Sequence, residues 1–170
     1  MAGKSRGGAP KSERIDARIL LIEARYYEDI ADELVVGAIA ELEARGCTYE
    51  RVEVPGALEI PQVLASLLSG PHLADMSDQE EVPYDGAIAL GCVIRGETSH
   101  YDIVCNNANH WLYEQAILAA FPVGNAILTV DTREQALARA RGGRDGKGAD
   151  AARAVLQLIE VGRKFASREA

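Results

Sequence analysis

The chain has 170 residues, of which 48% are hydrophobic and 26% charged, and its formal net charge is −8. This length suffices for one domain with a substantial core. The negative charge argues against general nucleic-acid binding, which needs a basic surface, and no apolar run approaches the roughly 18 to 20 residues that span a bilayer.

The N-terminal segment, MAGKSRGGAPKSERIDA, is basic and rich in small residues, and no apolar stretch resembling the core of a signal peptide follows it. We predict a disordered tail over residues 1–15 and a single domain over residues 16–170. The cysteines Cys47, Cys92 and Cys105 form neither a CxxC motif nor an even set. They indicate free thiols and therefore a cytoplasmic location.

The first half of the domain alternates between the two periodicities of strand and helix. Residues 17–24 form an apolar β-type run, and apolar residues then recur at helical spacing from Ile30 to Leu42, with Gly46 as a stop signal. Residues 48–54 predict a second strand. Residues 57–70 predict a helix with Pro61 in its first turn, where a missing N–H costs little. Residues 70–84 are polar and predict a loop.

The second half repeats this alternation. Residues 85–94 form a nearly continuous apolar strand, and Ser99 with Asp102 matches a capping box that opens a helix to about residue 121. Residues 123–130 predict a fourth strand. Thr132 with Gln135 is a second capping box, for a short helix ending near residue 141. RGGRDGKG breaks that helix, and residues 151–166 predict the last one.

Four strands that alternate with helices predict an α/β fold: a three-layer sandwich with a four-stranded parallel sheet and helices on both faces. Ligands of such sheets bind at the carboxyl ends of the strands. The third strand ends in Gly96, Glu97 and Thr98, whose N–H groups would face outward at a helix start and suit a phosphate or carboxylate. His100 would lie in the first helical turn, where an imidazole can exchange protons. The alternative is that His100 only helps to cap the helix.

Four further side chains admit both a binding role and a structural one. Glu59 stands at a helix start and either binds a ligand or offsets the helix dipole. Tyr26 either stacks on a planar ligand or packs. Arg139 and Lys147, considered alone, are ordinary solvated charges. No nucleophile elbow or metal-ligand spacing occurs.

Three motifs together resemble the lumazine synthase family: VPGALEIP (54–61), ALGCVIRGETSHYD (89–102) and VGNAILTVDTREQALARA (123–140), with DGKG (145–148) as a weaker match. Their order and spacing agree over residues 17–165. The resemblance implies a flavodoxin-like strand order. It also implies a cofactor-independent condensation of 5-amino-6-(ribitylamino)uracil with 3,4-dihydroxy-2-butanone 4-phosphate to 6,7-dimethyl-8-ribityllumazine, with release of phosphate and water.

The resemblance also implies residue roles. His100 would be the proton donor and acceptor, and Gly96, Glu97, Thr98 and Arg139 would bind the butanone phosphate. The pyrimidine and its ribityl chain would contact Tyr26, Ala57, Leu58, Glu59, Cys92, Val93, Ile94, Asn125 and Lys147. Of these, Lys147 would lie near the phosphate as well. Two positions depart from the family pattern, because Asn125 and Leu58 stand where many relatives have phenylalanine. At Asn125 we expect the loss of a stacking contact worth about 1 kcal/mol, or its replacement by a hydrogen bond to the ring.

Family members are pentamers with active sites between neighbouring subunits, and some pentamers close into shells. The resemblance therefore implies a homopentamer, single or paired face to face, in which Asn125 and Arg139 oppose the His100 cluster of the next chain. It also implies a functional link to riboflavin synthase. Two rival hypotheses remain: a non-catalytic ligand-binding or assembly protein on the same fold, and a flavodoxin-like nucleotide binder. The intact RGETSH segment argues against a mere scaffold.

Overall fold

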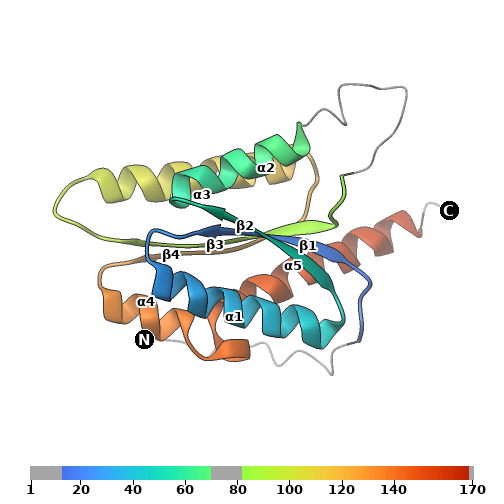
Figure 1. The fold of residues 1–170 in the computed structure, drawn as a ribbon. Helices are drawn as coiled ribbons and strands as arrows, with labels where there is room; N and C mark the ends of the chain where they lie inside the picture. Colours follow the sequence, from blue (N-terminus) through green and yellow to red (C-terminus); the bar gives the residue numbers. More distant parts are fainter. Residues whose placement is uncertain (1–12, 70–81, 169–170) are drawn as a thin grey trace.

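Four parallel strands form the central layer of the protein: β1 (Arg18–Ala24), β2 (Thr48–Val54), β3 (Gly86–Ile94) and β4 (Val123–Val130). They follow the order β2-β1-β3-β4. A computed structural model describes residues 13–69 and 82–168 (Figure 1). The order confirms the predicted parallel, flavodoxin-like sheet, in which the two inner strands β1 and β3 are hydrogen-bonded on both sides.

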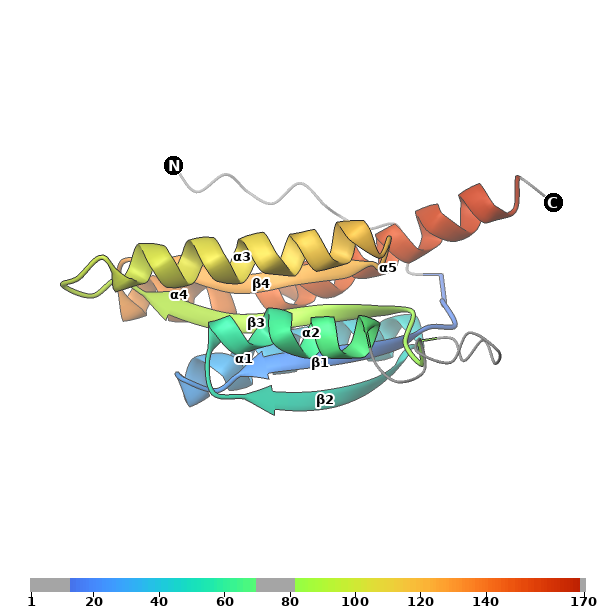
Figure 2. The same cartoon turned by 90° about the horizontal axis from the view of Figure 1, so that it is seen from above.

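Helices cover both faces of this sheet. The helices α1 (Glu28–Arg45), α4 (Arg133–Ala140) and α5 (Lys147–Ala166) lie on one face, and α2 (Ile60–Leu68) and α3 (His100–Leu118) lie on the other (Figures 1 and 2). Successive side chains of each strand point to opposite faces of the sheet and pack against the two helical layers in turn. In β1, Leu21 packs on the α1 side, whereas Leu20 and Ile22 pack on the α2 side. This alternation confirms the predicted three layers.

The two predicted capping boxes have different outcomes. Thr132 is extended, with φ −133° and ψ 159°, and its hydroxyl accepts a hydrogen bond from the Gln135 N–H at 3.2 Å. Ser99 is already helical, with φ −66° and ψ −2°, and makes no side-chain cap. The prediction for Ser99 was wrong because a side chain caps from an extended residue. The preceding Thr98 accepts instead, from the N–H of His100 at 3.4 Å.

Helix boundaries differ from the predictions at two places. The helix α3 ends at Leu118 rather than near residue 121, and Ala120 has a positive φ of 49°. The helix α5 begins at Lys147 rather than Ala151, after a turn in which Gly142 and Gly143 have positive φ. Pro61 lies in the first turn of α2, as predicted.

The described ends of the chain add two observations. Ile15 is buried, and its N–H donates to the carbonyl of Arg45 at 2.9 Å. The rest of the predicted tail and most of the predicted loop, residues 1–12 and 70–81, lie outside the described residues. Among the helices that the structure describes, none is long and apolar enough to cross a membrane.

Candidate active site

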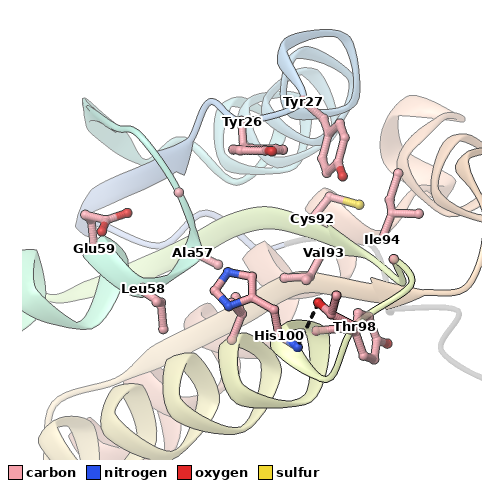
Figure 3. A pocket seen from close by; sticks show the side chains of 14 residues that line it. Tyr26, Tyr27, Ala57, Leu58, Glu59, Cys92, Val93, Ile94, Thr98 and His100 are labelled. Atoms are coloured by element: carbon pink, nitrogen blue, oxygen red, sulfur yellow. Dashed lines mark hydrogen bonds between the residues drawn. The ribbon is translucent and has the colours of Figure 1, made fainter.

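A hollow of about 350 Å³ opens at the carboxyl ends of β1, β2 and β3 (Figure 3). Parallel strands make this edge the place where loops from several strands meet. The loop after β1 brings Tyr26, the turn after β2 brings Ala57 to Glu59, and the end of β3 brings Cys92 to Ile94. The structure thus gathers ten predicted site residues in one hollow: Tyr26, Ala57, Leu58, Glu59, Cys92, Val93, Ile94, Gly96, Thr98 and His100.

His100 is the first residue of α3, and Figure 3 shows its ring pointing from the helix into this hollow, toward Ala57 and Leu58. The side chain is exposed on the hollow's side. No hydrogen bond from the ring to the helix is present among the described residues, and the role of His100 stays a prediction. An imidazole in this place can pass a proton to or from a molecule held between the strands.

The turn between β3 and α3 projects from one end of the molecule (Figure 2). The last hydrogen bond of the sheet at this end runs from the Arg95 N–H to the Val130 carbonyl, at 2.9 Å. Beyond it, Gly96, Glu97 and Thr98 are exposed, and no backbone carbonyl in the described part of the chain accepts a hydrogen bond from their amides. Gly96 and Thr98 line the hollow, and Glu97 does not. Free amides before a helix can bind an anion.

Arg95 braces this turn rather than facing the hollow. Its guanidinium donates to Asp131 at 2.9 Å, lies 3.6 Å from Asp102, and stacks on the ring of Tyr101 at 4.1 Å from the centroid. The hydrogen bond to Asp131 raises the pKa of Arg95, so its charge is permanent. This pairing links the ends of β3 and β4 to the first turn of α3, and so fixes where α3 begins.

Cys92 lies in the floor of the hollow and is buried. Burial raises the pKa of its thiol from 9.0 to about 11, because a thiolate is poorly solvated there. The group is therefore a neutral surface at physiological pH. This excludes a thiolate nucleophile and agrees with a backbone and packing role.

We expect Cys92 to react slowly with iodoacetamide in the native protein. At pH 8 its thiolate fraction should be about a hundredfold below that of an ordinary cysteine. Because the folded state binds this proton more tightly, its contribution to stability is complete below pH 9 and declines as the pH rises toward 11. Site-resolved mass spectrometry measures the rate of Cys92 alkylation in the native protein and in the urea-unfolded protein. Equal rates in both states would contradict the assignment.

Three predicted site residues lie in a different hollow. Asn125, Arg139 and Lys147 line a space of about 360 Å³ between β4, α4 and α5, and it shares no residue with the first hollow. Arg139 donates to the Gln135 carbonyl at 3.2 Å and makes no ion pair with any described residue. Lys147 contacts Asp150 at 2.7 Å. Within one chain, the candidate site is therefore divided.

Asn125 is held by local hydrogen bonds. Its amide nitrogen donates to Asn109 at 2.7 Å, and its oxygen accepts from the N–H of Ile127 at 2.8 Å on the edge strand β4. Each polar atom of the amide thus has one close partner, and because the oxygen keeps a second lone pair, a hydrogen bond from Asn125 to a ligand ring stays a prediction. The side chain of Asn125 links the edge strand β4 to α3 by its hydrogen bond to Asn109, which a phenylalanine could not form.

The structure adds residues to the site that the sequence did not indicate. Val104 lies one helical turn beyond His100 and therefore on the same face of α3, and Gly56 and Tyr101 also line the first hollow. Tyr27 lines it too, and as an aromatic beside Tyr26 it could be expected there from the sequence. The spacing from His100 could have indicated Val104. Asp150 joins the second hollow beside Lys147, three residues along α5. Among the described residues, no cluster of histidine, cysteine and acidic side chains could hold a metal ion.

The model of the 6,7-dimethyl-8-ribityllumazine synthase family matches residues 16–163. The chain belongs to this family. It is 47% identical over 161 residues to 6,7-dimethyl-8-ribityllumazine synthase 1 of Rhodopseudomonas palustris, covering 93% of this chain and 95% of that protein. It is 49% identical over 158 residues to the synthase of Methylorubrum populi, with 91% and 90% covered. For the Methylorubrum extorquens synthase the identity is 51% over 146 residues, with 86% and 81% covered.

Proposed function

We propose that this chain condenses 5-amino-6-(ribitylamino)uracil with 3,4-dihydroxy-2-butanone 4-phosphate to 6,7-dimethyl-8-ribityllumazine. The observation that carries the proposal is the position of His100, whose ring faces the hollow bordered by the free amides of Gly96 and Thr98. Family membership over residues 16–163 supports the same reaction. The non-catalytic alternative would not need an exposed imidazole beside an anion site.

The proposed mechanism depends mainly on positioning. An amine attacks a ketone readily once the two are held together, and this alone can supply much of the acceleration. The pyrimidine would stack on Tyr26, which is 75% exposed, and lie on the backbone of Cys92 to Ile94. The carboxylate of Glu59 lies close to Gly56, because a Cβ added to that glycine would be 3.2 Å from Oε2. This carboxylate would accept hydrogen bonds from the ribityl hydroxyls.

Proton transfer and phosphate release make up the remaining chemistry. His100 would take a proton from the attacking amine and return it to the carbinolamine hydroxyl, which leaves as water when the imine forms. The amides of Gly96, Glu97 and Thr98, together with Arg139, would stabilise the phosphate as its C–O bond breaks. Ring closure and a final dehydration then complete the product without an external oxidant, metal or organic cofactor.

The division between the two hollows supports an oligomer. The hollow with His100 and the hollow with Arg139 lie on different parts of one chain, so a complete site needs a head-to-tail contact between chains. We expect this contact to close into a pentamer, single or paired face to face. Light scattering at micromolar concentration should give at least five times the mass of one chain. A monomer would contradict this arrangement.

Purified protein mixed with both substrates tests the function. The expected result is visible lumazine fluorescence together with inorganic phosphate, each formed faster than in the spontaneous reaction. Product formation at the spontaneous rate would favour the ligand-binding alternative, and tight binding of a flavin phosphate would favour the nucleotide binder. We place the reaction in the cytoplasm, with riboflavin synthase as the enzyme that consumes the product.

Replacing His100 by alanine should lower kcat by about a hundredfold while the fold survives, because the side chain is exposed and positioning by the hollow remains. His110 on the same helix is the matched control. It is exposed and lies outside the hollow, with Glu114 at 3.4 Å and the ring of Trp111 at a centroid distance of 5.1 Å, so His110→Ala should leave kcat unchanged. An equal loss in both variants, or unfolding of His100→Ala by circular dichroism, would assign His100 a structural role.

A further inference from the structure

Glu41 is a charged residue that the proposed reaction does not use, and it is fully buried on α1. Two arginines donate to the same oxygen, Oε2: Arg144 through Nε and Arg153 through Nη1, each at 2.9 Å. The other oxygen, Oε1, is buried and has no hydrogen-bond partner among the described residues. Burying a carboxylate is costly unless it is fully paired. Because only one oxygen of Glu41 is paired among the described residues, packing alone does not account for its place in the core.

Arg153 carries the network from the core toward the second hollow. Its Nη2 donates to the carbonyl of Arg144 at 3.0 Å and to Oδ1 of Asp150 at 2.7 Å. The other carboxylate oxygen of Asp150 accepts from Lys147 at 2.7 Å. An unbroken chain of contacts therefore joins Glu41 to Lys147, and its last two members line the second hollow beside Arg139.

The backbone of residues 143–148 is also in close contact with α1. A Cβ at Gly37 would lie 2.7 Å from the carbonyl oxygen of Gly143, and one at Gly148 would lie 1.9 Å from that of Leu34. Both glycines permit a backbone approach that no larger residue allows. The glycine contacts set the distance between the turn and α1, and the ion network sets how its side chains are oriented.

We propose that Glu41 and Arg153 are positioning residues that hold Asp150 and Lys147 in the orientation that receives an anionic substrate. Neither touches the substrate, and both act through Asp150. The identity of the anion as the butanone phosphate rests on the proposed function, whereas the presence of Arg139 and Lys147 in the lining of the second hollow does not. The rival interpretation is a purely structural link between α1 and α5.

Arg153→Lys separates these interpretations. Lysine keeps the charge and can pair with Glu41, but one ammonium cannot also serve the Arg144 carbonyl and Asp150 as the planar guanidinium does. We expect KM for the butanone phosphate to rise about fivefold to tenfold with kcat within about twofold. The Kd of inorganic phosphate, measured by isothermal titration on the assembled protein, should rise by the same factor. Glu41→Gln should change both constants in the same direction.

Arg45→Lys is the matched control. Like Arg153, Arg45 joins α1 to α5, through Glu160 at 2.7 Å, but it is buried and lies outside both hollows. The substitution Arg45→Lys should lower the melting temperature about as much as Arg153→Lys does, and it should leave the KM for the butanone phosphate and the Kd of inorganic phosphate unchanged. If Glu41→Gln fails to fold, Arg153→Lys still decides, since its side chain is 25% exposed.

The outcomes separate this inference from the proposed function. Synthase turnover with unchanged KM and Kd in Arg153→Lys overturns the inference and leaves the function standing. A selective rise of the phosphate Kd in a protein that makes no product supports the inference and removes the function. Wild-type protein that binds no phosphate overturns the inference as well.

Discussion

Replacing Arg139 by alanine should raise KM for the butanone phosphate about thirtyfold to a hundredfold, which corresponds to about 2–3 kcal/mol for a lost charged hydrogen bond. The guanidinium makes no ion pair within the described residues, so its charge is available to a ligand. KM for the pyrimidine should change little. Steady-state kinetics with each substrate varied in turn measures the two effects.

Arg141 provides the matched control for this substitution. It follows the same helix and is exposed, but its guanidinium faces Glu33 at 3.5 Å and lies outside the second hollow. Arg141→Ala should leave both KM values unchanged, and Arg139→Lys should recover part of the lost affinity because it keeps the charge. Equal increases in both KM values for Arg139→Ala would contradict its assignment to the phosphate.

Gly148→Ala should destabilise the protein by about 3 kcal/mol or more. The added Cβ would lie 1.9 Å from the carbonyl oxygen of Leu34 and 3.1 Å from the nitrogen of Ala38, which are backbone atoms of α1. Neither a rotamer change nor a side-chain shift relieves such a contact, so α5 must move away from α1. Urea unfolding at fixed protein concentration measures the loss.

Gly162 lies in the same helix and is the matched control, because the space around it is open. A Cβ there would meet nothing within 4 Å, so Gly162→Ala should be neutral or stabilise by about 0.5–1 kcal/mol. A similar loss in both variants would show that helical glycine, rather than close approach to α1, determines the effect. Gly148→Ala should also weaken phosphate binding, because it displaces Lys147.

Local patterns predicted the elements well where a single physical signal was sufficient. Helical spacing placed the helix that ends at Gly46, whose φ of 75° is the left-handed conformation that glycine adopts readily. The capping residue was right for Thr132 and wrong for Ser99, since the backbone angles at the cap are not encoded in the motif. The early start of α5 was missed because Gly148 weakens a helical pattern, although that glycine is needed for contact with α1.

The sequence alone determined the strand–helix alternation and the family, and it predicted an anion site at the exit of β3. These depend on residues close together in the chain, whose spacing and chemistry can be compared directly. Only the tertiary structure decided that Lys147 lines the same hollow as Asn125 and Arg139. It also decided that Asn125 hydrogen-bonds to Asn109 and Ile127, and that Glu41 is linked to Lys147 through Arg153 and Asp150. Such contacts join segments up to about a hundred residues apart, and they depend on strand order and on how α1 packs against α5, which no local pattern specifies.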